Sequence, residues 1–250
     1  MRAAGLDIGS RTTKLVVRDG DATVVARFAD TSHDPLAVAR GLLAEVAFDR
    51  LVVTGYGRHL VGARLGAEAV SEIKAAAVGA RAVAPAARTV LDVGGQDTKV
   101  IALDAAGRLS RFHMNDRCAA GTGRFLEMMA VALGQPPAEF AAEALAAPRG
   151  EKLSTMCAVF AESEVVSLVA KGAPRAEIAR GIHEAAATRL VAMARSLPLE
   201  DDVVFVGGGA LNACLVALVG RGLGRPVVVP PDPRLVAALG CALLAGPVGG

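Results

Sequence analysis

Short apolar runs that end at turn residues recur along the chain and predict most of its strands. The predicted strands cover residues 5–8, 14–17, 23–28, 50–54, 88–93, 98–103, 202–206 and 226–229. Runs of this length, bounded by glycine or other turn residues, are typical of strands. The first two are expected to form a hairpin, because apolar segments lie on both sides of a short turn.

Longer stretches with helical spacing lie between these strands. The predicted helices cover residues 36–48, 71–84, 121–133, 159–171, 174–197 and 233–244. Asp34 and Pro35 provide an N-cap and a first-turn proline for the first helix, and Pro85 ends the second. Strands that alternate with helices in this way predict an α/β fold.

The opening segment of the chain recurs at its middle. Residues 7–14 align without a gap on residues 92–99, with Asp, Gly, Thr and Lys identical and Ile aligned with Val. A solenoid needs more copies than two, so the repeat predicts two similar lobes that face each other. We expect residues 1–87 and 232–250 to form one lobe and residues 88–231 the other, with the last helix folding back onto the first lobe.

Each copy of the repeat contains a glycine turn between two strands, which is a candidate phosphate site. Glycine has no Cβ and adopts positive φ, so backbone N–H groups in such a turn can converge on an anion. An aspartate ends the strand before each turn, and carboxylates are ligands suited to Mg²⁺. A third cluster, residues 207–209, lies at a strand-to-helix junction that suits a flat ring or a phosphate. One such turn alone is more often an ordinary hairpin, but three in one chain favour a phosphate ligand.

Composition narrows the classes of function. Hydrophobic residues make up 53% of the chain and charged residues 21%, which favours a sizeable core and little disorder. The formal net charge of +2 and the aromatic content of 3% argue against partners such as nucleic acid or an anionic membrane. No apolar stretch is long enough to span a membrane, and no leader segment is recognisable. We therefore expect a cytoplasmic protein.

The four cysteines then need an explanation other than disulfides, which are rare in the cytoplasm. Cys214 and Cys241 lie in apolar helical stretches and are expected to be core residues. Cys118 and Cys157 each lie near the predicted start of a helix, where the helix dipole and free N–H groups favour a thiolate. Two thiolates are too few for a [4Fe–4S] cluster, which has four cysteine ligands, but a two-fold dimer supplies four.

Six motifs follow one another along the chain, and their order can be compared with that of known families. They cover residues 55–58, 71–74, 92–99, 115–125, 157–164 and 207–212. Residues 7–14, 92–99 and 206–212 resemble the two phosphate motifs and the adenosine motif of the actin, sugar kinase and heat-shock chaperone ATPase superfold. Together with the two cysteine motifs, they closely resemble the activators of 2-hydroxyacyl-CoA dehydratases, in the wider family that includes the ATPase subunits of benzoyl-CoA reductase.

The resemblance implies a two-lobed actin-like (ribonuclease H-like) ATPase fold, with duplicated mixed sheets and a nucleotide cleft between them. It also implies a homodimer with ATP or ADP and Mg²⁺ in each subunit, and one [4Fe–4S] cluster held between the subunits by Cys118 and Cys157. Such a protein accepts an electron from reduced ferredoxin or flavodoxin. It passes the electron, at the expense of ATP, to an iron–sulfur dehydratase or reductase component.

The same resemblance implies roles for individual residues. Asp7 and Asp92 would position Mg²⁺, and Gln96 or Asp97 would orient the attacking water. Independently of the resemblance, Glu162 and Glu164 are expected to reach the nucleotide ribose or a residue that contacts the ligand, although a solvated helix face or a capping role is an equally good interpretation. The nucleotide would contact Gly9, Ser10, Arg11, Thr12, Lys14, Gly94, Gly95, Gly207, Gly208, Gly209 and Asn212.

Three alternatives stay open at this point. The chain suits an ATPase subunit of a benzoyl-CoA reductase-type complex. It also suits a small-molecule kinase of the same superfold, in which both cysteines are structural. A non-catalytic interpretation is an ATP-binding regulatory or chaperone-like module, whose partner binding depends on the nucleotide.

Overall fold

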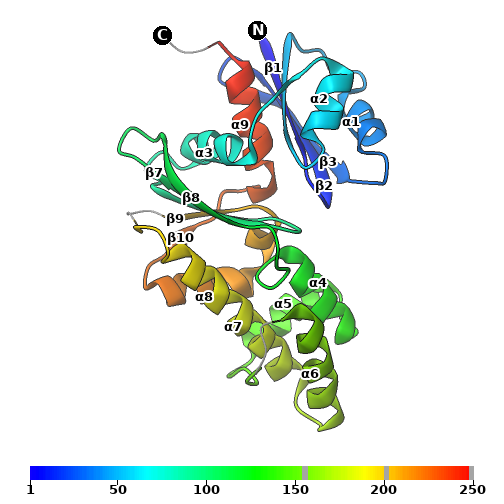
Figure 1. Cartoon of the computed structure of the whole chain (residues 1–250), viewed down its shortest axis with the longest axis vertical. Coiled ribbons are helices and arrows are strands. Elements are labelled where there is room, and N and C mark those ends of the chain that lie inside the picture. Colours follow the sequence, from blue (N-terminus) through cyan, green and yellow to red (C-terminus); the bar gives the residue numbers. More distant parts are fainter. Residues whose placement is uncertain (154–156, 200–202, 248–250) are drawn as a thin grey trace.

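The structure, a computed structural model, describes residues 1–153, 157–199 and 203–247. Figure 1 shows two sheets with helices between them and on their outer faces. Residues 154–156, just before the second cysteine motif, residue 202 of a predicted strand and residues 248–250 of the first predicted lobe lie outside the described residues. Within the described part, no helix is both long and apolar enough to cross a membrane.

The two sheets have the same strand order and the same strand directions. The first sheet runs β3-β2-β1-β4-β5, and the second runs β8-β7-β6-β9-β10. In each sheet the first three strands in sequence pair antiparallel and the last two join in parallel. The first sheet consists of β1 (Arg2–Ile8), β2 (Thr12–Asp19), β3 (Ala22–Asp30), β4 (Arg50–Gly55) and β5 (Glu68–Ala69). The second consists of β6 (Thr89–Val93), β7 (Thr98–Leu103), β8 (Leu109–Asn115), β9 (Val203–Val206) and β10 (Val227–Val228).

The sequence repeat corresponds to an identical place in both sheets. Asp7 on β1 lies directly opposite Lys14 on β2, and Asp92 on β6 lies directly opposite Lys99 on β7. The two glycine turns therefore leave equivalent strands at equivalent positions. The prediction of duplicated mixed sheets in an α/β fold is confirmed.

Helices cover the two sheets in layers. The outer face of the first sheet packs against α1 (Pro35–Leu43) and α2 (Arg58–Leu65). Between the sheets lie α3 (Glu72–Val83) and α9 (Val236–Ala245). The far face of the second sheet carries α4 (Gly123–Ala132), α5 (Pro137–Ala146), α6 (Ala158–Ala170), α7 (Arg175–Ala194) and α8 (Ala213–Leu223). Two 3₁₀ turns, Gly208–Leu211 and Pro233–Leu235, precede α8 and α9.

Helices α3 and α9 cross at two glycines. A Cβ built on Gly79 would lie 1.9 Å from the carbonyl oxygen of Val236, and one built on Gly240 would lie 1.9 Å from that of Ala75. Only glycine allows backbones to approach this closely. The crossing brings α9, the last helix of the chain, against β1, β2 and β4 of the first sheet.

Several elements differ from the sequence predictions. The first helix ends at Leu43 rather than at residue 48, because the chain turns at Ala44 and Glu45 adopts φ of 62°. The long helix predicted to end at residue 197 ends at Ala194. Four elements were not predicted: α2, β5, β8 and α5. β8 is mostly exposed, so its sequence lacks the apolar run by which the other strands were found.

Candidate functional site

The two glycine turns open into one cleft between the sheets. Its cavity of about 640 Å³ is in the usual range for a small-molecule site. Both copies of the repeat and the third glycine cluster line the cavity, so the tertiary structure brings together three segments that are far apart in sequence. The predicted residues that line it are Asp7, Gly9, Ser10, Arg11, Thr12, Lys14, Asp92, Gly94, Gly95, Asp97, Gly207, Gly208, Gly209 and Asn212.

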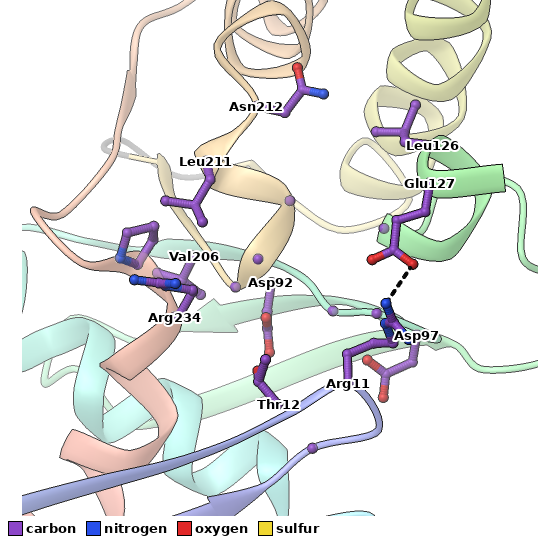
Figure 2. A pocket seen from close by; sticks show the side chains of 18 of the residues that line it. Arg11, Thr12, Asp92, Asp97, Leu126, Glu127, Val206, Leu211, Asn212 and Arg234 are labelled. Atoms are coloured by element: carbon purple, nitrogen blue, oxygen red, sulfur yellow. Dashed lines mark ion pairs between the residues drawn. The ribbon is translucent and has the colours of Figure 1, made fainter. Parts of the chain in front are cut away.

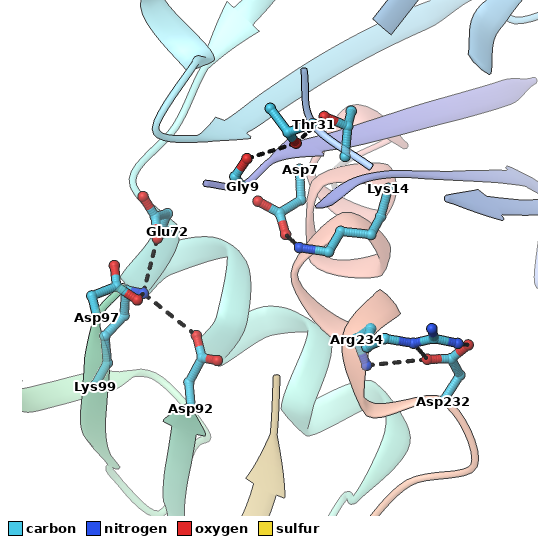
Figure 3. A network of polar contacts seen from close by, with 11 residues as sticks. Asp7, Gly9, Lys14, Thr31, Glu72, Asp92, Asp97, Lys99, Asp232 and Arg234 are labelled. Atoms are coloured by element: carbon cyan, nitrogen blue, oxygen red, sulfur yellow. Dashed lines mark hydrogen bonds and ion pairs between the residues drawn. The ribbon is translucent and has the colours of Figure 1, made fainter. Parts of the chain in front are cut away.

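The first turn is fixed by its own backbone and by β3. The Gly9 N–H donates to the Thr12 carbonyl at 3.1 Å, and the Thr31 hydroxyl donates to the Gly9 carbonyl at 2.8 Å. Beneath the turn, the Lys14 ammonium donates to Asp7 Oδ2 at 2.9 Å (Figure 3). The turn is therefore held in place while the lysine already has a carboxylate partner.

The second turn has the same backbone bond but a denser charge cluster. The Gly94 N–H donates to the Asp97 carbonyl at 2.9 Å. The buried Lys99 ammonium lies 2.8 Å from Asp97 Oδ1 and 2.9 Å from Glu72 Oε2 on α3, and 3.7 Å from Asp92 Oδ2 (Figure 3). Asp97 Oδ2 is buried with no hydrogen-bond partner among the described residues. An unpaired buried carboxylate oxygen beside a cavity is suited to a ligand or a cation.

Burial and charge shift the protonation of this cluster. Burial raises the pKa of Asp92 and that of Glu72 above their ordinary values, and the positive charge of Lys99 only partly opposes this. Burial alone would lower the pKa of Lys99, but Asp92, Glu72 and Asp97 together hold that pKa above its ordinary value. The lysine therefore stays charged, and the carboxylates outnumber the ammonium groups at the floor of the cleft.

The third glycine cluster is held against the second sheet. Gly207 has φ of 83°, and a Cβ on it would lie 2.5 Å from Asp92 Oδ1. Asn212 caps α8 by accepting from the Leu215 N–H at 2.9 Å, and its amide nitrogen donates to His183 Nε2 at 2.9 Å. His183 Nδ1 lies 2.7 Å from the Ala179 carbonyl, so this nitrogen carries the proton. Burial lowers the pKa of His183 to about 4, which keeps the ring neutral.

Several lining residues are not among the site residues predicted from the sequence. They include Tyr56, Glu72, Glu127, Leu211 and Arg234, of which the first two and Leu211 lie within the sequence motifs. Figure 2 shows Arg234 and Leu211 near the third glycine cluster, with Glu127 reaching toward Arg11 across the cleft. Arg234 forms two ion-paired hydrogen bonds with Asp232, at 3.1 and 3.0 Å, and its guanidinium lies 3.9 Å from the centre of the Phe28 ring.

Comparison with known proteins agrees with this geometry. Residues 4–245 match the BadF/BadG/BcrA/BcrD ATPase family. The chain belongs to this ATPase family. The resemblance found in the sequence is thereby confirmed.

Similar proteins cover nearly the whole length of this family member. The activator of lactoyl-CoA dehydratase from Anaerotignum propionicum is 39% identical over 254 residues, which are 98% of this chain and 97% of that protein. A benzoyl-CoA reductase component from Thauera aromatica is 32% identical, over 96% of this chain and 91% of that protein.

Solved structures agree in fold. The activator of the 2-hydroxyisocaproyl-CoA dehydratase from Clostridium difficile with bound ADPNP has a TM-score of 0.91 at 37% identity, covering 98% of this chain and 94% of that one. A ROK family glucokinase from Streptomyces griseus has a TM-score of 0.60 at 15% identity, covering 98% and 99%. The distant likeness concerns the fold alone, and it agrees with the predicted actin-like ATPase and sugar kinase fold.

Four predicted residues of this BadF/BadG/BcrA/BcrD family member are not among those that line the cleft. The Gln96 side chain is exposed, although its neighbour Asp97 is buried. Glu164 lies on α6, away from the lining residues. Cys118 is half-buried in the segment between β8 and α4, and the exposed Cys157 is the N-cap residue of α6.

Proposed function

We propose that this family member is an ATP-dependent activase that passes a low-potential electron to a partner iron–sulfur enzyme, such as a 2-hydroxyacyl-CoA dehydratase. One observation carries the proposal beyond ATP hydrolysis: the second glycine turn is bonded directly to the helix that follows Cys118. The Gly123 and Arg124 N–H groups, at the start of α4, donate to the Gly94 and Gly95 carbonyls at 2.9 Å each. A change at the phosphates would therefore reach the segment that holds the cysteine.

The cleft suits a nucleoside triphosphate that spans both lobes. Backbone N–H groups of the two glycine turns and the Lys14 ammonium would bind the phosphates. Gly207, Gly208 and Gly209 leave room for the ribose and base, and Asn212 is held in a fixed orientation beside them by His183. Two similar relatives are named as dehydratase activators, and one of them was solved with ADPNP bound.

The charge of the cleft supports Mg²⁺ as part of the ligand. Asp7, Asp92, Asp97 and Glu72 face Lys14, Lys99 and the Arg58 guanidinium, which lies 3.8 Å from Glu72 Oε1, so four carboxylates are opposed by three cationic groups. A polyphosphate alone would be repelled by this excess of negative charge. A divalent cation bound through carboxylates or their waters removes the repulsion. Asp7 and Asp92, which occupy equivalent positions on β1 and β6, are the groups proposed to hold it, directly or through water.

Asp97 is the better of the two proposed residues for orienting the attacking water. Its free oxygen lies beside the cavity, and Lys99 fixes the other oxygen, whereas the Gln96 side chain is exposed. An Asp97→Asn variant that retained full ATP turnover would remove Asp97 from this role.

The two cysteines fit half of a [4Fe–4S] ligand set. Cys118 and Cys157 precede α4 and α6, and these two helices pack against each other in the core of the second lobe. No group of three or more His, Cys, Asp or Glu residues suited to a metal ion occurs among the described residues. When bound, a [4Fe–4S] cluster would supply one-electron transfer.

The surface of α6 supports a second copy as the source of the other two ligands. Phe160, Val166 and Val169 of this helix are 66%, 57% and 51% exposed. Large apolar side chains exposed on a helix favour a surface that another chain covers. Cys157 is the N-cap residue of the same helix. A homodimer formed there would therefore bring Cys157 of one copy and Cys157 of the other copy to the interface.

The partner proteins follow from this chemistry. A reduced ferredoxin or flavodoxin would deliver the electron, and an iron–sulfur dehydratase or reductase component would receive it. The similarity to the Thauera aromatica benzoyl-CoA reductase component favours an ATPase subunit of a reductase complex as the second candidate. Both candidates use the same cleft and the same cysteines.

Anaerobic purification with iron analysis tests the proposal. We expect about four irons per dimer and visible absorption, both lost in Cys118→Ser and in Cys157→Ser. Cys214→Ala is the matched control, because this thiol is fully buried in the core and should not affect iron content. An iron-free chain that hydrolyses ATP, or that phosphorylates a small molecule, would contradict the activase and favour a kinase of the same fold.

A further inference from the structure

One ion pair crosses the cleft from the first lobe to the second. Arg11, in the turn between β1 and β2, places its guanidinium Nη2 3.2 Å from Glu127 Oε2 on α4 (Figure 2). The Arg11 side chain passes over the second glycine turn, where a Cβ built on Gly95 would lie 2.4 Å from Arg11 Cγ. The absence of a side chain at Gly95 therefore gives Arg11 its route across the cleft.

The far end of this ion pair belongs to the helix that follows Cys118. The start of α4 is bonded to the carbonyls of Gly94 and Gly95, and the Thr98 hydroxyl donates to the Gly121 carbonyl at 2.9 Å. Within the same segment, the Asn115 amide donates to the Cys118 carbonyl at 2.8 Å. The second turn, the cysteine segment and α4 thus form one bonded unit, and Arg11 ties that unit to the opposite lobe.

The ion pair is built to be exchanged rather than to be permanent. The side chains of Arg11 and Glu127 are 53% and 32% exposed, and exposed ion pairs contribute little to stability. Arg11 also lines the cavity among the residues proposed to bind phosphate. A guanidinium binds phosphate oxygens in a two-pronged geometry, and a triphosphate carries more negative charge than one carboxylate.

Glu127 keeps a second cation when Arg11 leaves. Arg124, one turn earlier on α4, lies 3.4 Å from the same Oε2 atom. The carboxylate is therefore not left alone after an exchange, which lowers the cost of the exchange. Arg124 lies on the same helix as Glu127, so this second pair does not connect the lobes.

We propose that Arg11 is an exchange residue that couples nucleotide binding to α4. Arg11 exchanges Glu127 for the phosphates when a triphosphate binds, and this exchange releases α4 from the first lobe. The inference rests on the proposed nucleotide site. It assigns Glu127 as a positioning residue that competes with the triphosphate for Arg11.

The competition determines whether each substitution raises or lowers the affinity for the triphosphate. Glu127→Gln should strengthen triphosphate binding by about two- to fivefold, the range expected from the loss of an exposed ion pair. Arg11→Gln should weaken triphosphate binding. The substitutions should not be independent, because Glu127 acts through Arg11: in the Arg11→Gln background, Glu127→Gln should have little effect.

Calorimetric titration of the full chain with the magnesium complex of a non-hydrolysable ATP analogue tests the coupling. Wild type, both single variants and the double variant form the cycle, and Asp104→Asn is the control for loss of one exposed acidic charge outside the cleft. We expect the control to bind as wild type does. An equal gain from Glu127→Gln with and without Arg11 would show general electrostatics and overturn the exchange, as would no gain. If wild type bound no nucleotide, the proposed function would fail together with the exchange.

Discussion

Gly240, at the crossing of α3 and α9, is a position where one added methyl group should lower the stability of the protein. A Cβ there would lie 1.9 Å from the Ala75 carbonyl oxygen, 2.8 Å from its carbon and 3.0 Å from the Gly79 nitrogen. All three atoms belong to the backbone of α3, so no side chain can rotate away. The helices would have to separate by roughly 1.5 Å to restore ordinary contact distances.

Two opposing effects determine how much Gly240→Ala changes the free energy of unfolding. Overpacking of a close contact costs about 1–3 kcal/mol, and backbone contacts lie at the upper end of that range. Alanine in a helix is favoured over glycine by about 1 kcal/mol. The expected result for Gly240→Ala is therefore a decrease of about 1–2 kcal/mol in the free energy of unfolding. Separation of α3 from α9 should also weaken nucleotide binding, because both helices contribute to the walls of the cleft.

A second helical glycine provides the matched control. Gly41 in α1 is exposed, and a Cβ on it would have no atom within 4 Å. Gly41→Ala should therefore increase the free energy of unfolding by about 0.5–1 kcal/mol. The two substitutions are chemically the same but are expected to have opposite signs, so the difference isolates the helix crossing.

Urea denaturation followed by far-ultraviolet circular dichroism suits this measurement, because the chain has no Trp and a single Tyr for fluorescence. The reasoning is refuted if Gly240→Ala is as stable as wild type while Gly41→Ala shows the expected gain. Gly79→Ala meets the same crossing from the other side, so its effect should not add to that of Gly240→Ala.

Two further substitutions test the buried polar groups. Lys99→Met should lower stability by about 3–5 kcal/mol at neutral pH, because three carboxylates lose their shared cation. This loss of stability should become smaller as the pH falls. Burial raises the pKa of Asp92 and that of Glu72, so these carboxyl groups become protonated first and their repulsion disappears. Equal losses in urea denaturation at two pH values would contradict this explanation. His183, with its pKa lowered to about 4 by burial, binds a proton more readily when unfolded, so stability should fall as pH drops below 6.5, by up to about 3 kcal/mol near pH 4. His183→Gln should flatten this pH dependence, and an unchanged slope would exclude His183 as its source.

The sequence repeat implies a strand that has no apolar run of its own. The repeat places β6 and β7 in the roles of β1 and β2, and the strand after β2 is β3. The equivalent strand, β8, could have been predicted from this correspondence, although its exposed face has no apolar run. Similarly, the proline pair at residues 136–137 was a signal for the start of α5, because proline is favoured in the first turn of a helix.

The sequence by itself determined the strands, the glycine turns and the positions of the two cysteines before helices, because each of these depends on neighbouring residues. Apolar runs specify strands, and a hydrogen bond of the turn's own backbone closes each of the first two glycine turns, so both features are visible in short windows of sequence. The cysteine positions before α4 and α6 are local features of the same kind. The family, the fold and the glycine and aspartate residues of the cleft could therefore be predicted from the sequence.

Only the tertiary structure decided which distant side chains meet. Glu72 reaches Lys99 because α3 lies between the sheets, and Arg11 reaches Glu127 because Gly95 leaves room for it to pass. Charges and hydrogen-bonding groups carry no periodic signal that identifies a partner in another lobe. Their pairing depends on how the two sheets and the α3–α9 crossing place the lobes, and that placement is set by packing between segments that are remote in the sequence.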